Sequence, residues 1–286
     1  MRWTKNLVKE MTEANPEMLY LPMPQEIKNI FPVPTPEICK EYFHINFTLE
    51  PTGKLAGIRN LSTTCKVSKK CRARIEKAFR LVDPAFVLDG ASDDDVKKVR
   101  AKLEKYITEN PENKNVSVCG FCFSDRQQSF MKTMVDPLTH NYHLLNNGII
   151  HPDWLPYTNN LFFRIESFGD SDSVNHATNM LNIVRKNPST FFGIWTKNPE
   201  YYHKALEGKA ENKPSNCNFL LSSQYVNRAA KIPVKYHYFI DKVFTVYTPE
   251  YLEAKNLTAN CGSRACMTCK NCYCKNNIQN IREIKK

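Results

Sequence analysis

The sequence predicts an α/β protein in which βα repeats form a part-barrel or another parallel sheet, with cysteine-rich metal-binding loops and an irregular N-terminal arm. Segments rich in aromatic and β-branched residues start near residues 161, 191, 218 and 242. Helical periodicity follows the first two of them. This spacing is typical of parallel strands joined by helices, and it leaves a barrel, a part-barrel and an open sheet as alternatives.

Length and composition indicate a soluble globular protein. The chain has 286 residues, of which 42% are hydrophobic and 24% charged, and it is long enough to bury one large core or two moderate ones. No run approaches the ~20 apolar residues of a membrane span, and the first residues lack a signal-peptide core. We therefore expect no membrane association and a reducing compartment, the cytoplasm, in which eleven cysteines suggest metal binding.

The predicted domain organisation is an irregular arm at 1–52 followed by one α/β domain at 53–286. Within that domain, 72–118 is a helical insertion and 259–276 is a cysteine cluster. Cys39 stands alone in the arm and is predicted to be a buried thiol. Prolines break any long element in the arm, at Pro16, Pro22, Pro24, Pro32, Pro34 and Pro36.

The first part of the domain begins with a short strand. Residues 53–71 predict this strand and a loop that carries Cys65 and Cys71. A helical pattern follows from Arg72 to about Phe79. Cys65 and Cys71, which are candidate metal ligands, are therefore expected just beyond the end of this strand.

A second helix is expected at 93–110, because acidic residues favour its N-terminus and Pro111 ends it. A Cys-x-x-Cys pair, Cys119 and Cys122, comes next, and another helix is predicted at 124–134. One apolar stripe marks the 93–110 helix: Val96, Val99, Leu103, Tyr106 and Ile107.

From residue 161 the pattern becomes regular. Serines at 171–173 can cap a helix that ends at Pro188, and a further helix is predicted at 199–207. The predicted strands are 161–167, 191–196, 218–223 and 242–248.

Polar residues stand at the ends of these strands. In parallel sheets such positions face the ligand, so we expect a shared cleft near the first cysteines, although a surface salt-bridge network is the alternative. The catalytic residues, if any, are unknown. The cleft candidates are Arg164, Glu166, Asp170, Lys197, Ser222 and Tyr225.

The C-terminal cysteines carry the strongest signal for metal. Cys266, Cys269 and Cys272 form a Cys-x-x-Cys-x-x-Cys run, with Cys261 or Cys274 as the fourth ligand. Repeated two-residue steps wrap thiolates around one centre, as in ferredoxin-type sites. All-thiolate ligation favours an iron–sulfur cluster or zinc over harder metals, and disulfides or unrelated thiols are the remaining alternative.

Cys65, Cys71, Cys119 and Cys122 make a second candidate site. Their separation in sequence is compatible with a fold that brings loops together. Separated pairs also suit structural zinc, so a 4Fe–4S cluster and zinc both stay open at this site.

The formal net charge of +11 suggests nucleic acid as a partner. However, four thiolates around a core of charge 2+ leave −2 at each site, so two clusters would lower +11 to about +7. The basic residues are also dispersed. One local group stands out: Lys66, Lys69, Lys70, Arg72 and Arg74.

Several short motifs occur in a defined order between about residues 53 and 273. Together they resemble the pattern of the bacteriophage gene product 88 family, a group of uncharacterised phage proteins. The resemblance implies phage origin, hence the host cell cytoplasm, two cysteine sites on one α/β domain, and Cys261 as the fourth C-terminal ligand. The motifs are Thr64-Cys65, Cys71, Cys122-Phe123-Ser124, Phe163-Arg164-Ile165-Glu166-Ser167-Phe168-Gly169-Asp170, Trp195-Thr196-Lys197 and Cys261…Cys266…Cys269…Cys272.

The sequence departs from the family pattern in three ways. A long segment separates Cys71 from Cys119, where the family has a few residues. Cys119 and Cys274 are additional cysteines, and Glu166 and Phe168 alter the strand-end motif.

The arrangement also resembles radical S-adenosylmethionine enzymes, which place a cluster on a part-barrel, but the chain lacks their Cys-x-x-x-Cys-x-x-Cys loop. The resulting hypothesis is a protein with two 4Fe–4S clusters and redox or radical-type chemistry at the cleft. The alternatives are a zinc- or cluster-stabilised basic module that binds nucleic acid or a protein partner without catalysis, and a structural protein in which clusters act as staples. S-adenosylmethionine is one ligand to test.

Overall fold

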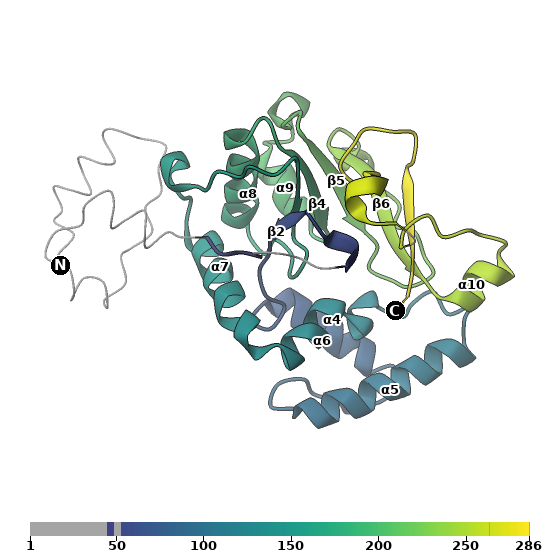
Figure 1. The fold of residues 1–286 in the computed structure, drawn as a ribbon. Helices are drawn as coiled ribbons and strands as arrows, with labels where there is room; N and C mark the ends of the chain where they lie inside the picture. Colours follow the sequence, from purple (N-terminus) through teal and green to yellow (C-terminus); the bar gives the residue numbers. More distant parts are fainter. Residues whose placement is uncertain (1–44, 49–52, 263, 286) are drawn as a thin grey trace, which may run out of the picture.

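A computed structural model describes residues 45–48, 53–262 and 264–285 (Figure 1). Most of the predicted arm, including Cys39, lies outside the described residues. The part of it that is described contains a strand, β1 (Phe47–Thr48), which pairs antiparallel with β2 (Arg59–Leu61). The remaining description therefore concerns the α/β domain.

The centre of the molecule is an open sheet whose strands follow the order of the sequence from β1 to β7. All neighbours from β2 onward are parallel. The α/β prediction is confirmed, and the closed-barrel alternative is wrong because β1 and β7 form the two edges. The other strands are β3 (Phe162–Ile165), β4 (Phe191–Thr196), β5 (Cys217–Ser222), β6 (Ile240–Tyr247) and β7 (Asn280–Ile284).

Helices connect the strands, and caps that are visible in the sequence begin several of them. Ser68 and Ser173 each accept a hydrogen bond from a first-turn amide, and Ser92 forms a capping box with Asp95. No helix of the described ranges is long and apolar enough to cross a membrane. The helices are α4 (Lys69–Phe79), α5 (Asp93–Glu109), α6 (Phe123–Phe130), α7 (Val135–Asn147), α8 (Val174–Lys186), α9 (Pro199–Ala205), α10 (Pro249–Ala254) and α11 (Cys266–Cys269).

The two faces of the sheet are covered by different parts of the chain. Side chains alternate along a strand, so Phe163 and Ile165 pack into the core formed with α7, α8 and α9. Their neighbour Phe162 faces the other side, where it packs with Trp195 and Tyr273. The C-terminal cysteine segment therefore covers the face opposite the helices, as the yellow chain in Figure 1 does.

A helical lobe lies at the carboxyl ends of the strands (Figure 1). It contains α4, α5 and the 3-10 turn η2 (Val118–Phe121), which share a separate apolar core. Of the predicted stripe, Val99, Leu103 and Ile107 are buried, and Val96 and Tyr106 are partly buried. The stripe therefore packs α5 against the rest of the lobe as expected.

The backbone of η2 approaches α4 and α5 closely at Gly120. A Cβ there would lie 2.5 Å from a Leu103 methyl and 2.8 Å from the Ala78 Cβ. Glycine allows this approach, which brings the neighbouring Cys119 back toward Cys71.

Several predicted boundaries need correction. Cys71 lies in the first turn of α4 rather than in a loop, because Ser68 caps the helix three residues earlier. The helix predicted at 124–134 ends at Phe130, and a 3-10 turn leads into α7. Three elements of the structure, α7, α10 and β7, were not predicted from the sequence.

Candidate metal centres

The C-terminal cysteines form a lid on one face of the sheet. Tyr273 anchors this lid, because its ring is 3% exposed and lies 5.4 Å from that of Phe162 and 5.9 Å from that of Trp195. Gly193 of β4 makes room for it, since a Cβ there would lie 2.7 Å from Trp195 and 3.1 Å from Tyr273. The aromatic packing thus fixes where the flanking cysteines lie.

Four of these cysteines surround one cavity of about 280 Å³, here called the C-terminal cavity. Cys274 does not line this cavity, although it packs against the apolar cluster of the sheet face as Cys261, Cys266 and Cys272 also do. Three cations also line the cavity: Lys54, Arg264 and Lys270. The four cysteines are Cys261, Cys266, Cys269 and Cys272, the set that the family pattern implies.

Three thiols of this cavity, Cys261, Cys266 and Cys272, have raised pKa values. Burial raises the pKa of Cys261, although Lys54 opposes the rise by donating a hydrogen bond of 3.0 Å to its sulfur. Burial and the neighbouring Cys261 raise the pKa of Cys272 to about 12. The pKa of Lys54 is also raised, because Glu283 and Cys261 outweigh the lowering effect of burial. A thiolate formed here needs a cation to stabilise it.

The second set, Cys65, Cys71, Cys119 and Cys122, also meets in space and is here called the N-terminal quartet. Three of the four are buried, with 4%, 6% and 7% exposure for Cys65, Cys71 and Cys119. The Cys65 thiol forms hydrogen bonds with Cys122 and Cys71, and these contacts raise the pKa of Cys65. The inserted segment between Cys71 and Cys119 therefore begins and ends at the N-terminal quartet.

The thiols of the N-terminal quartet differ in acidity. The hydrogen bond from Cys65 is the main reason why the pKa of Cys122 falls to about 6, and the Asp125 amide and Lys197 add to it. Burial raises the pKa of Cys119 to about 11. The quartet thus combines one thiol of lowered pKa, Cys122, with two of raised pKa, Cys65 and Cys119, beside the cationic Lys197.

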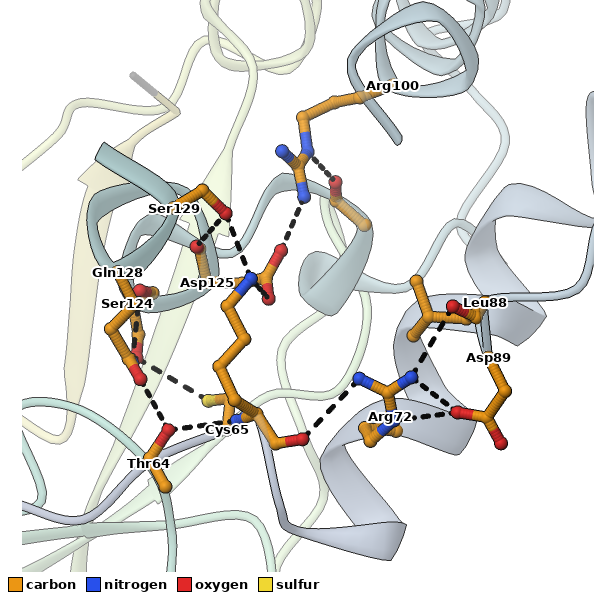
Figure 2. A network of polar contacts seen from close by, with 12 residues as sticks. Thr64, Cys65, Arg72, Leu88, Asp89, Arg100, Ser124, Asp125, Gln128 and Ser129 are labelled. Carbon is orange, nitrogen blue, oxygen red and sulfur yellow. Dashed lines mark hydrogen bonds and ion pairs between the residues drawn. The ribbon is translucent and has the colours of Figure 1, made fainter. Parts of the chain in front are cut away.

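A polar network holds the quartet in place (Figure 2). The Ser124 hydroxyl lies 3.5 Å from the Cys65 sulfur and accepts a hydrogen bond of 2.8 Å from the Gln128 amide. Asp125 pairs with Arg100 of α5 at 2.8 Å and with Lys66 at 3.0 Å. These contacts tie α6 both to the loop after β2 and to the helical lobe.

All cysteines of the described ranges are free thiols, so the disulfide alternative is wrong for them. Within those same ranges, no three His, Cys, Asp or Glu side chains are positioned to hold a metal ion. The thiols instead meet as hydrogen-bonding groups or around a cavity, and ligation would require loss of their protons.

Three of the six cleft candidates line one cavity of about 550 Å³, here called the strand-end cavity: Lys197, Ser222 and Tyr225. Asp170 lies behind it and accepts hydrogen bonds from the Thr196 hydroxyl at 2.8 Å and the Lys197 amide at 2.7 Å. Burial raises the pKa of Asp170 despite Lys197 and Arg74. Burial alone would lower the pKa of Lys197, but Cys119, Asp170 and Cys122 raise it.

The other two candidates lie elsewhere, so the expectation of one cleft around all six residues is corrected. Arg164 is inside β3 and points to the opposite face, where its guanidinium lies 4.0 Å from the centre of the Trp195 ring. Glu166 is 3% exposed and has a φ of 61°, with its Oε1 lying 2.9 Å from His176 Nε2. Sequence reasoning missed His176, although it lies in the first turn of a predicted helix.

Comparisons with known proteins add one finding. A family profile described as Gene product 88 matches residues 26–285, which is most of the chain. No curated protein and no solved structure matches the sequence.

Proposed function

The chain belongs to the gene product 88 family of phage proteins, and from this premise we propose that it is an iron–sulfur protein acting in the host cell cytoplasm. The family description names no activity, so the proposal depends on the chemistry of the thiols. It is supported chiefly by the C-terminal cavity, whose lining includes four cysteines of one short segment. A 4Fe–4S cluster held by Cys261, Cys266, Cys269 and Cys272 fits this set of donors.

The size of the cavity favours a cluster over a single zinc ion. Four thiolates at ~2.3 Å from zinc lie roughly 3.8 Å from one another and enclose nothing else. The C-terminal cavity of about 280 Å³ is many times the ~30 Å³ that one water molecule occupies in the liquid. A core of several iron and sulfide ions suits this space, and it suits soft thiolate donors.

Charge supports the same assignment. Four thiolates around a core of charge 2+ carry a net charge of about −2, which would be costly beside a packed sheet face. The cavity is lined by three cations, Lys54, Arg264 and Lys270. The positive charge of Arg164, on the sheet, opposes the rise in the pKa of Cys266 and Cys272 that burial causes. These cations would stabilise the bound cluster once the thiol protons are released.

The N-terminal quartet is proposed as a second centre, because four thiols from distant segments meet there. A second cluster and zinc remain the two alternatives. Four thiolates can hold either one zinc ion or a cluster, so metal analysis has to distinguish the two.

Redox chemistry is the activity that such a cluster would supply, with radical-type chemistry as a more specific form. The alternative is a basic module that binds nucleic acid. The basic group of the sequence gives that alternative little support, since four of its members are paired: Lys66 with Asp125, Lys70 with Glu200, Arg72 with Asp89 and Arg74 with Asp170.

The test is metal content after anaerobic purification. We expect absorbance near ~400 nm and iron and sulfide in equal amounts, with about four of each per chain from the C-terminal site. Cys269→Ala should abolish the iron and sulfide of the C-terminal site. Cys274→Ala is the matched control, because Cys274 does not line the cavity, and it should keep the full content.

Unchanged iron in Cys269→Ala, or loss in Cys274→Ala alone, would refute the assignment. Zinc retained in Cys269→Ala and lost in Cys65→Ala would identify the N-terminal quartet as a zinc site. Reduction by dithionite, followed by electron paramagnetic resonance, would separate a redox cluster from one that only stabilises the fold.

A further inference from the structure

The strand-end cavity has an excess of positive charge. Its charged lining consists of three cations, Lys197, Arg228 and Lys231, and one carboxylate, Glu200. Glu200 already pairs with Lys70 at 2.9 Å, so its charge is largely neutralised. The cationic side chains therefore favour an anionic ligand.

One wall of the cavity is flat and partly apolar. The guanidinium of Arg228 lies 3.9 Å from the centre of the Tyr225 ring, so the two planar groups are in contact. Leu221, Pro199 and Pro233 contribute apolar surface to the same lining. A planar ring fits against such a wall, through both apolar contact and stacking on the guanidinium.

The position in the fold is also one where ligands bind. Ser222 is the last residue of β5, and Lys197 follows the last residue of β4. In open parallel sheets, ligands bind outside the carboxyl ends of the strands. Ser222 and Gln224 add hydrogen-bonding groups to the lining, and the volume of about 550 Å³ is that of a typical small-molecule site.

We propose that the strand-end cavity binds a phosphate-bearing small molecule with a planar ring, the chemistry of a mononucleotide. The phosphate lies against Lys197, Arg228 and Lys231, and the ring lies against the wall formed by Tyr225, Arg228 and Leu221. This inference stands on the charge and shape of the cavity, with Arg228 and Lys231 as the main cations because Lys197 also faces Asp170 and the N-terminal quartet.

The test is calorimetric titration of the full chain with AMP, ADP and ATP, and with adenosine and pyrophosphate as partial ligands. We expect each nucleotide to bind more tightly than either partial ligand, and binding to weaken as salt rises. Arg228→Ala and Lys231→Ala should each weaken binding roughly tenfold, because each removes a charged contact to phosphate. Both side chains are exposed, so the fold should persist.

Lys235→Ala is the matched control, because Lys235 is an exposed cation close in sequence that does not line the cavity. It should bind as the wild type does. Equal binding of adenosine and AMP would overturn the role of the cations, and equal binding of pyrophosphate and ADP would overturn the role of the wall. Binding of a single-stranded oligonucleotide without any mononucleotide would overturn the proposal in favour of a nucleic-acid surface.

Discussion

At the scale of single residues, Glu166 shows how the end of a strand can be locked. Its backbone has a φ of 61°, a conformation that few non-glycine residues adopt, and its amide donates to the Leu61 carbonyl at 2.9 Å. The carboxylate accepts a hydrogen bond of 3.2 Å from Thr63 and faces His176. The backbone strain is thus held by contacts with β2 and α8.

The ionisation of Glu166 should contribute to the pH dependence of the free energy of unfolding. Burial raises the pKa of Glu166 above the ordinary value of 4.5, against the opposing effect of His176 and with a smaller raising effect of Asp170. Because the pKa of Glu166 is raised in the folded state, its contribution to stability is complete below about pH 4.5. This contribution is lost as the pH rises through the pKa of the folded state.

The change to make is Glu166→Gln, which keeps the shape and removes the titration. The free energy of unfolding of the wild type, minus that of the variant, should fall as the pH rises above about 4.5. Urea unfolding at a series of pH values measures it. A difference that stays constant from about pH 4 to 8 would mean that Glu166 does not carry the raised pKa.

Residue types also explain what the sequence could predict of the sites. The spacing of the cysteines predicted two sets, and the thiols of each set lie near one another in the structure; that they bind metal stays a prediction. The six-residue cleft was too large, because Arg164 lies within β3 rather than after it. Alternation along the strand sends its side chain to the face opposite Phe163.

At the scale of elements, the segment after β3 packs on the segment after β2 through Gly169. This glycine has a φ of 75°, and a Cβ would lie 2.8 Å from the Thr63 carbonyl carbon. The Thr63 amide also donates to the Phe168 carbonyl at 3.2 Å. The loop that carries Cys65 is therefore held by close backbone packing.

Gly169→Ala should cost on the order of 3 kcal/mol or more, because it combines an unfavourable φ with a backbone clash. Gly90→Ala is the control, since Gly90 has a φ of 80° and nothing within 4 Å of the added Cβ. It should cost only about 1 kcal/mol. Equal losses in urea unfolding would show that the contact with Thr63 contributes nothing.

The elements also differ in how well they could be predicted from the sequence. The strand β4 was predicted with its observed bounds, because its residues form one continuous apolar run. β7 was missed because it contains charged residues and buries chiefly Ile281. α7 was missed because Pro137 reads as a break, whereas a proline in the first turn of a helix is tolerated.

At the scale of the whole molecule, the C-terminal segment acts as a lid on a sheet face. The Asn218 amide lies 3.4 Å from the Cys272 carbonyl, and Lys242 donates to the Ile278 carbonyl at 3.2 Å. The backbone hydrogen bonds of residues 264–278 are mostly local to α11 and the turn after it, so much of the attachment of the lid should come from Tyr273 and from the proposed metal.

Removal of metal should therefore loosen residues 261–278 selectively. Hydrogen exchange of the metal-loaded and chelated protein should show faster exchange in this segment and little change in α8, which is buried on the opposite face. Exchange that is the same in both states would mean that the lid is ordered by packing alone.

The order of the strands has a consequence for biosynthesis. Each strand pairs with its neighbour in sequence, so the sheet can grow in the direction in which the ribosome releases the chain. The longest interval between two strands lies between β2 and β3, and the helical lobe is synthesised in this interval. The lobe can then fold around its own core. β7 and the C-terminal cysteines come last, when the rest of the sheet is already in place. A cofactor delivered to those cysteines would therefore meet a chain whose strands from β1 to β6 have already been synthesised.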